Sequence, residues 1–369
     1  MNPNNSILQQ RVNKVKNIIG EQNDLDAFLL VRDESIINYD LQFLTGFSGS
    51  SAFALVTQNS CILFTDMRYV EQATHECNQW EIRLHGRPVT DSISQLVKEL
   101  DIKKIGFDPT GITVSLLNMI STGIVSAKFV SKPGIVTNIR EYKDGFELSA
   151  ISSAADITDW AFKEILKYLR PGVTESYLAS NLENLIKSKG AEGLAFDSIV
   201  AAGPNSALPH ARPSNRKLCT GDLVVFDFGA RVNGYCSDMT RTVVVGRASS
   251  EQGKLYEAVL SVQEKSLEFM RIGVKCNDVA LKAEESIRAR GYGDYPSHSL
   301  GHGLGLAIHE APYLRVGSKD ILTTGHVVTV EPGIYIPGSG GVRIEDTVLI
   351  GEDGVKVLTK TTKNFLRIG

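Results

Sequence analysis

The sequence lacks the features that would direct it to a membrane, an oxidising compartment or a nucleic acid. No apolar run is long enough to cross a bilayer, and the first residues, MNPNNSILQQ, show no basic start followed by an apolar stretch. The five cysteines form no CxxC pair and are odd in number, which is typical of free thiols in a reducing compartment. A net charge of −3 does not favour nucleic acid or an anionic membrane. We therefore expect a soluble, cytoplasmic protein.

The composition that remains is that of an ordinary globular protein with about two domains. The 369 residues are 42% hydrophobic and 22% charged. Strand-like runs alternate with helical stripes in the first part, which is typical of an α/β domain. The glycine-rich turn at 46–51 has no P-loop lysine and no GxGxxG spacing, so we interpret it as structural and not as a phosphate-binding loop. We expect strands at 26–31, 51–57, 61–66 and 104–108, and helices at 7–21, 91–100 and 114–122.

The second part is predicted to repeat one plan of two helices followed by two strands. Pro133 and Gly134 indicate the boundary, and we assign 1–136 to an N-terminal α/β domain and 137–369 to a C-terminal α+β domain. We infer the repeat from the pattern of elements, because the two halves share little residue identity. We expect helices at 144–170 and 174–189 before strands at 223–229 and 235–246, and helices at 250–271 and 277–290 before strands at 326–336 and 342–350.

Each predicted strand pair carries two acidic residues close to its turn. Asp227 and Asp238 flank Asn233-Gly234, a strong hairpin signal, and we expect them to face each other across the ladder. Glu331 and Glu345 flank the turn PGSGG in the same manner. Like charges placed opposite each other destabilise a bare hairpin, and a bridging cation removes that penalty. The pattern therefore favours a metal site.

A histidine completes the candidate ligand set. His302 lies in GHGLGLAIHE, where missing side chains allow the backbone to approach a ligand. Four carboxylates and one imidazole suit a hard or borderline divalent ion, and five ligands suffice for a two-metal hydrolytic centre. Taken singly, each acid is more often solvated or salt-bridged, and each histidine is more often structural. Cys236 is interpreted as a small buried hydrophobe and not as a ligand.

Five segments of the second part form a recognisable set: AAGPNSALPHARPS, VVFDFGARVNGYCSDMTRT, SHSLGHGLGLAIHEAP, VVTVEPGIYI and GVRIEDTVLI. They resemble the proline-specific metallopeptidases of the pita-bread fold, Xaa-Pro aminopeptidase (aminopeptidase P) and Xaa-Pro dipeptidase (prolidase). The resemblance covers nearly all of 144–365, and LTGFSGSSAFALVT and LFTDMRYVEQA are similar to the creatinase-like N-terminal domain of the same family. Methionine aminopeptidases share the five ligands but generally lack the long N-terminal domain.

The resemblance implies a role for each site residue. The metal ligands would be Asp227, Asp238, His302, Glu331 and Glu345, and the catalytic residues would be His210, His298, His309, Glu331 and Arg343. Glu331 would take the proton of the attacking water. We expect two divalent ions, Mn²⁺ in the first place, with Co²⁺ or Zn²⁺ as replacements.

The substrates implied are peptides with proline at the second position, and the resemblance implies a homodimer or a larger homo-oligomer. The runs ALPHARPS, LTGFSGSSAF and TDMRY favour an Xaa-Pro aminopeptidase. Xaa-Pro dipeptidase is the alternative. A non-catalytic, metal-bound scaffold or binding protein is the third reading, and the complete ligand set argues against it.

Overall fold

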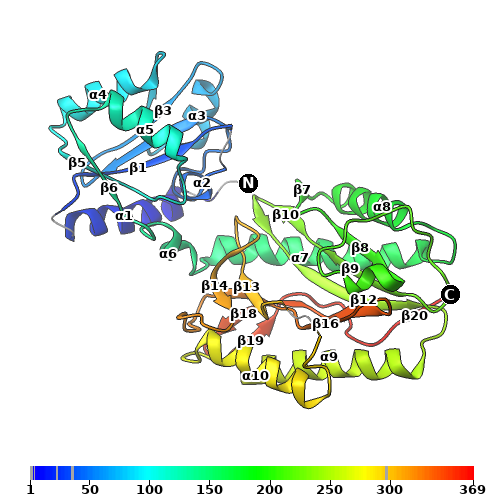
Figure 1. The fold of residues 1–369 in the computed structure, drawn as a ribbon. Helices are drawn as coiled ribbons and strands as arrows, with labels where there is room; N and C mark the ends of the chain where they lie inside the picture. The colour runs from blue at the N-terminus through cyan, green and yellow to red at the C-terminus, as the bar shows by residue number, and fades with distance from the viewer. Residues whose placement is uncertain (1–2, 4, 22–23, 35–36, 296–297) are drawn as a thin grey trace. The chain divides into compact units, whose positions relative to one another are not determined.

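The computed structural model describes residues 3, 5–21, 24–34, 37–295 and 298–369, and the chain divides into two units, Met1–Arg140 and Glu141–Gly369 (Figure 1). We predicted the domain boundary between 136 and 137, and the short helix α6, Thr137–Arg140, belongs to the first unit. No helix within the described residues is long and apolar enough to cross a membrane.

The N-terminal unit is built on a six-stranded mixed sheet in the order β4-β3-β2-β1-β5-β6. Strand β1 pairs antiparallel with β2 and parallel with β5, and the predicted α/β fold is confirmed. Helices α4 and α5 bury Ile93 and Ile120 in the core cluster that includes strand residues Leu29, Leu55 and Ile105. The strands are β1 (Ala27–Arg32), β2 (Ala52–Thr57), β3 (Cys61–Thr65), β4 (Glu81–Leu84), β5 (Lys104–Phe107) and β6 (Lys128–Ser131). The helices before α6 are α1 (Asn5–Glu21), α2 (Tyr39–Thr45), α3 (Val70–Glu76), α4 (Val89–Glu99) and α5 (Val114–Gly123).

The glycine-rich segment 46–51 is a structural turn. Gly46 ends α2 with a φ of 75°, a left-handed conformation that suits glycine. The backbone N–H and the hydroxyl of Ser48 both donate to the carboxylate of Glu76, at 2.8 and 2.7 Å. Because an acidic side chain accepts from these donors, the turn does not present them to a phosphate.

The C-terminal unit places its sheets between two helix pairs, with α7 and α8 on one side and α9 and α10 on the other (Figure 1). This arrangement confirms the predicted pita-bread fold. The helices are α7 (Gly145–Ile165), α8 (Glu175–Ser188), α9 (Ser250–Phe269) and α10 (Cys276–Ala289), with 3-10 turns η1 (Leu166–Tyr168) and η2 (Gly203–Ala207). The strands are β7 (Gly193–Leu194), β8 (Ile199–Ala202), β9 (Leu223–Phe228), β10 (Ala230–Val232), β11 (Tyr235–Cys236), β12 (Met239–Val245), β13 (Gly301–Gly303), β14 (Glu310–Leu314), β15 (Val327–Val330), β16 (Gly333–Ile336), β17 (Gly340–Arg343), β18 (Asp346–Gly351), β19 (Gly354–Val357) and β20 (Arg367–Ile368).

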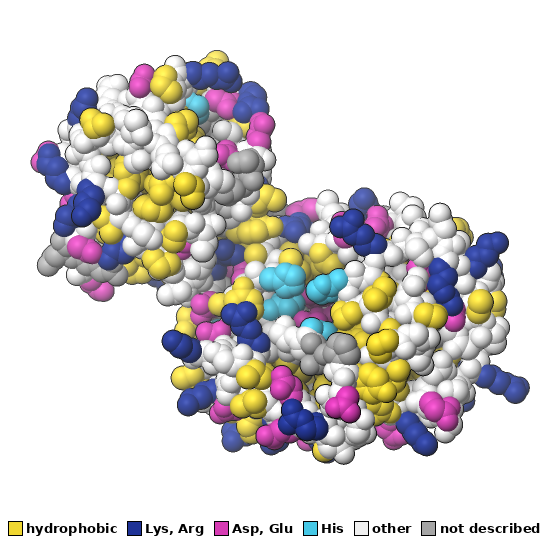
Figure 2. All heavy atoms as spheres, in the orientation of Figure 1, with side chains coloured by type: hydrophobic (Ala, Val, Ile, Leu, Met, Phe, Trp, Pro, Cys, Tyr) yellow, Lys and Arg dark blue, Asp and Glu magenta, His cyan; other side chains and the backbone are white. Residues whose placement is uncertain are grey.

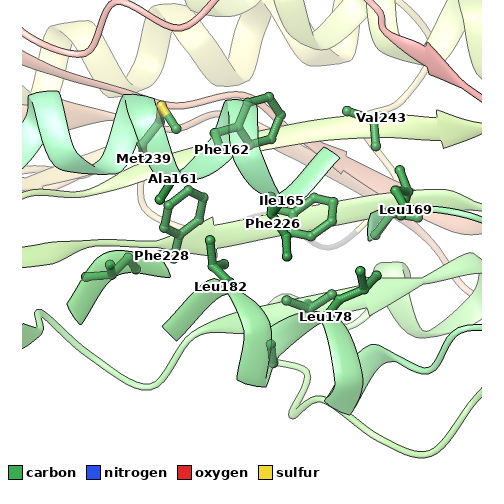
Figure 3. Packing of buried hydrophobic residues seen from close by; sticks show 14 of the residues in the cluster. Ala161, Phe162, Ile165, Leu169, Leu178, Leu182, Phe226, Phe228, Met239 and Val243 are labelled. Carbon is green, nitrogen blue, oxygen red and sulfur yellow. The ribbon is translucent and has the colours of Figure 1, made fainter. Parts of the chain in front are cut away.

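Two of the sheets correspond to the two halves of the predicted repeat. The sheet β20-β12-β9-β8 carries the first strand pair, and the sheet β14-β13-β15-β18-β19 carries the second. Figure 3 shows the first core, where helices α7 and α8 cover β9 and β12. Phe162 of α7 meets Phe226 of β9 edge to face, with ring centroids 6.0 Å apart. Full burial of such side chains contributes roughly 1.5–3 kcal/mol each and fixes the helices on the sheet.

Candidate metal centre

The first acidic pair lies where the first hairpin changes from one ladder to the next. Strand β9 pairs with β12, and β10 pairs with β11 in the same register, with Gly229 and Asp238 in the break between the two ladders. A side chain at Gly229 would meet the carbonyl oxygen of Ser237 at 1.8 Å, so only glycine fits there. Asp227 lies opposite Thr240, two positions from Asp238. The two acids are therefore diagonal neighbours on one side of the ladder, as expected, but they are not directly opposite each other.

The second acidic pair lies at the matching break of the second hairpin. Strand β15 pairs with β18 up to Val330 and Asp346, and β16 pairs with β17 from Gly333 and Arg343. The register is continuous across this break, so Glu331 and Glu345 lie opposite each other, as the symmetry of the sequence about its turn predicts.

Hydrogen bonds join the two hairpins directly. The N–H of Glu345 donates to the carbonyl of Thr240 at 3.1 Å, and the hydroxyl of Thr347 donates to the carbonyl of Asp238 at 2.7 Å. The hydroxyl of Thr242 donates to the carbonyl of Arg343 at 2.9 Å. These bonds bring the two breaks, and the acids within them, to one place.

Three of the five candidate ligands form one buried group. Asp238, His302 and Glu345 each offer a donor atom, and these atoms lie within 4.8 Å of one another. Their exposed fractions are 4%, 7% and 1%. Glu331 adjoins the group, with its Oε1 3.3 Å from Nε2 of His302. Asp227 accepts a hydrogen bond from Nη2 of Arg343 through its Oδ2.

The chemistry of this donor set fits divalent cations. Among the described residues, no hydrogen-bond donor reaches the buried atoms Asp227 Oδ1, Asp238 Oδ1 and Glu345 Oε1. A buried carboxylate oxygen without a donor is costly unless a cation neutralises it. Four carboxylates and one imidazole are ligands that hard and borderline divalent ions accept.

The pKa values of the acids reflect their crowding. Burial raises the pKa of Asp238 well above its ordinary value, and the charges of Glu345 and Asp227 add to this. Burial also raises the pKa of Glu345, again with help from neighbouring carboxylates. Burial opposes ionisation of Glu331 too, but His302 and the charge of His298 outweigh it, so the pKa of Glu331 is lowered. Glu331 thus ionises more readily than Asp238 and Glu345.

The predicted histidines differ in how closely they approach the acids. Burial lowers the pKa of His298, whose Nδ1 lies 3.7 Å from Oε2 of Glu331. His309 is exposed and stands edge to face on His302, with ring centroids 4.3 Å apart. His210 is exposed as well, and its charge helps to lower the pKa of His309, after burial and His302. Figure 2 shows histidine side chains gathered on one face of the C-terminal unit, with acidic side chains between them.

Three polar residues of the site were not predicted from the sequence. The hydroxyl of Thr240 donates to Oε2 of Glu345 at 2.7 Å, and the hydroxyl of Thr329 donates to Oε1 of Glu331 at 3.3 Å. The hydroxyl of Tyr335 accepts from Nη1 of Arg343 at 2.7 Å and lies 2.8 Å from Nε2 of His298. A signal was present for the threonines, because each lies two residues from a candidate ligand on a strand and therefore on the same face.

Two similar halves that meet at paired carboxylates and a histidine define a metal-dependent hydrolase of the pita-bread type. Comparison with known proteins identifies the family within this class. The model of metallopeptidase family M24 matches residues 149–352, and that of the Creatinase/Prolidase N-terminal domain matches 11–142. The chain belongs to metallopeptidase family M24, whose members use divalent metal ions.

Relatives with full-length similarity carry two kinds of name. An Xaa-Pro dipeptidase from Pyrococcus horikoshii is 34% identical, and the match covers 98% of this chain and 99% of that one. The structure of an Xaa-Pro dipeptidase from Bacillus anthracis is 37% identical with a TM-score of 0.93, covering 98% of this chain and all of that one. The structure of an X-Pro aminopeptidase from Thermotoga maritima is 37% identical with a TM-score of 0.90, covering 96% of this chain and all of that one.

Proposed function

We propose that this chain is a metal-dependent Xaa-Pro dipeptidase. The observation that carries the proposal is the meeting of two acidic hairpins and His302, with buried carboxylate oxygens that no described donor reaches. Such oxygens are tolerated when a cation binds them. The five residues that would hold two ions are Asp227, Asp238, His302, Glu331 and Glu345.

Bound divalent ions, Mn²⁺ by our expectation, would polarise the scissile carbonyl and lower the pKa of the attacking water. The side chains of the protein have separate tasks. Glu331 accepts the proton of that water, because His302 and His298 favour its ionised form and its carboxylate adjoins the other candidate ligands. His309 stands exposed beside His302 and donates to the oxyanion that develops on the carbonyl.

The substrate residue after the scissile bond has no N–H to offer. Proline lacks that donor and fixes φ, so the enzyme must hold the ring and whatever follows it. In an Xaa-Pro dipeptide, the group next to the proline ring is the C-terminal carboxylate of the proline itself. We assign its recognition to the linked groups His298, Tyr335 and Arg343, together with His210.

The comparisons give more support to dipeptidase activity than to the aminopeptidase activity that we predicted from the sequence. Full-length relatives from Pyrococcus horikoshii and Bacillus anthracis bear the name Xaa-Pro dipeptidase. Xaa-Pro aminopeptidase remains the second candidate, because the Thermotoga maritima structure of that name has a TM-score of 0.90.

Three matched substrates separate these activities. Mn²⁺-loaded protein is incubated with Ala-Pro, Ala-Pro-Ala and Ala-Ala, and the products are followed by chromatography. We expect rapid cleavage of Ala-Pro, slow cleavage of Ala-Pro-Ala and little cleavage of Ala-Ala. Preferred release of alanine from Ala-Pro-Ala would make the chain an aminopeptidase. Cleavage of none of the three would favour the non-catalytic scaffold, and an Asp238→Ala variant controls for contaminating peptidases.

A further inference from the structure

Arg241 is a buried cation that hydrogen-bonds to the backbone of two residues of the candidate metal centre. It belongs to β12, its exposed fraction is 2%, and it is among the largest fully buried side chains of the described residues. A guanidinium has five N–H donors, and this one uses each of them. The acceptors are the carbonyls of Thr240 (2.9 Å), Thr361 (2.7 Å), Thr362 (3.1 Å) and Glu345, and Oδ1 of Asp346 (2.7 Å).

Two of these acceptors belong to residues of the candidate centre. Thr240 donates its hydroxyl to the side chain of Glu345, and its carbonyl accepts the N–H of Glu345. Arg241 holds the carbonyl of Glu345 and the carbonyl of Thr240 with one nitrogen, Nη1. The backbone of Glu345 is therefore fixed at its N–H and at its carbonyl, and both contacts come from β12.

The other carbonyls belong to residues 359–363, which we call the C-terminal strap. The strap is itself anchored, because Asp159 of α7 accepts the N–H of Lys360 at 2.7 Å and the N–H of Thr361 at 2.8 Å. Lys363 of the strap pairs with Oδ2 of Asp346 at 2.9 Å. Arg241 thus ties the backbone beside Glu345 to a segment that is bound to the long helix α7.

An ion pair in this position is not explained by stability alone. Arg241 and Asp346 are 2% and 1% exposed, and well-packed apolar residues are often as favourable as a buried ion pair. An apolar residue does not hold four carbonyl groups in place. A planar guanidinium holds them, because its five N–H donors point in fixed directions. Groups that hydrogen-bond to a metal ligand orient that ligand toward its metal.

We propose that Arg241 is a positioning residue that holds Glu345 in the geometry needed to bind a divalent ion. The proposal rests on the proposed role of Glu345 as a ligand. It assigns to Arg241 no contact with the substrate.

The test is the affinity of the metal-free protein for Mn²⁺, measured by calorimetry in Arg241→Lys. Lysine keeps the charge opposite Asp346 but has three donors in place of five. We expect Mn²⁺ to bind about 10-fold or more weakly, as is usual when a group that orients a ligand is changed. The matched control is Arg140→Lys, a buried arginine paired with Asp40 at 2.8 Å in the N-terminal unit, and it should bind Mn²⁺ as the wild type does.

A folded Arg241→Lys protein with wild-type Mn²⁺ affinity would overturn the proposal. Glu345→Ala is measured beside it, and unchanged binding in that variant would instead refute the ligand role of Glu345. Asp159→Asn provides a second test that leaves the arginine intact, because it weakens the anchor of the C-terminal strap. We expect it to weaken Mn²⁺ binding too, and wild-type affinity there would contradict the role of the strap.

Discussion

Thr240 offers a sharp test of the candidate metal centre, because its hydroxyl donates to Oε2 of Glu345 at 2.7 Å. The hydroxyl oxygen of Thr240 also accepts a hydrogen bond from Nε of Arg343 at 3.1 Å. Thr240→Val removes the hydroxyl and leaves the shape of the side chain nearly unchanged. Loss of a hydrogen bond to a charged group costs about 1.5–3 kcal/mol of unfolding free energy. Loss of a group that orients a ligand weakens metal binding about 10- to 100-fold.

Thr242→Val is the matched control on the same strand and the same face. Thr242 is 1% exposed, and its hydroxyl exchanges hydrogen bonds with the backbone of Arg343, at 2.9 and 3.1 Å. Among the described residues, its hydroxyl has no hydrogen bond to the side chain of a candidate ligand. We expect this variant to lose about 1 kcal/mol of stability, the usual net value of a neutral hydrogen bond, and to keep its Mn²⁺ affinity.

Both variants are titrated with Mn²⁺ by calorimetry and unfolded in denaturant with and without the metal. The reasoning predicts weaker Mn²⁺ binding in Thr240→Val alone. Equal affinities in Thr240→Val and the wild type, or an equal loss in Thr242→Val, would refute the contribution of Thr240 to the centre.

Three further predictions concern the catalytic side chains, the metal-free state and assembly. His309→Ala should lower kcat about 10²–10³-fold while Mn²⁺ binding survives, and wild-type turnover would remove His309 from the catalytic residues. Burial raises the folded-state pKa values of Asp238 and Glu345, so ionisation of these two acids should cost the metal-free protein stability as the pH rises through those values. Thermal unfolding between about pH 5 and about pH 8 should show this loss without Mn²⁺ and much less of it with Mn²⁺, and a flat metal-free profile would contradict it. Light scattering should show at least a dimer at assay concentration, and a fully active monomer would contradict the predicted homo-oligomer.

The sequence predicted the hairpins well because their signals are local. Asn233 and Gly234 have φ values of 49° and 81°, the left-handed values that the Asn-Gly turn of a two-residue hairpin requires. Glu331 and Glu345 lie opposite each other because their register follows from counting outward from the turn. The two-residue period of the strands and the recognisable turn were thus sufficient to predict that Glu331 and Glu345 pair across the hairpin.

The first acidic pair was misplaced because its two acids are not equally far from the turn. Asp227 lies six residues before Asn233, and Asp238 lies four residues after Gly234. Counting outward from the turn in one register places Asp227 opposite Thr240, as the structure does. The break in the pairing at Gly229 and Asp238 is not visible in that count, because it depends on the close approach of the backbone at Gly229.

Contacts between elements distant in the sequence were also out of reach. Four of the five hydrogen bonds of Arg241 join β12 to residues more than a hundred positions away, and the contact of Arg343 with Asp227 spans a similar distance. No local sequence pattern indicates that an arginine in a largely apolar strand will hydrogen-bond to distant backbone carbonyls. These hydrogen bonds depend on how the elements pack, which only the three-dimensional structure shows.

Metal content is the measurement that tests the central claim most directly. Protein reconstituted with excess Mn²⁺, freed of unbound metal and analysed by mass spectrometry should approach two ions per chain, the stoichiometry of a two-metal hydrolytic site. Asp238→Ala should lose metal and Ala-Pro hydrolysis together. A stoichiometry that never exceeds one, or a variant that keeps its full metal content, would contradict a dinuclear centre built on these residues.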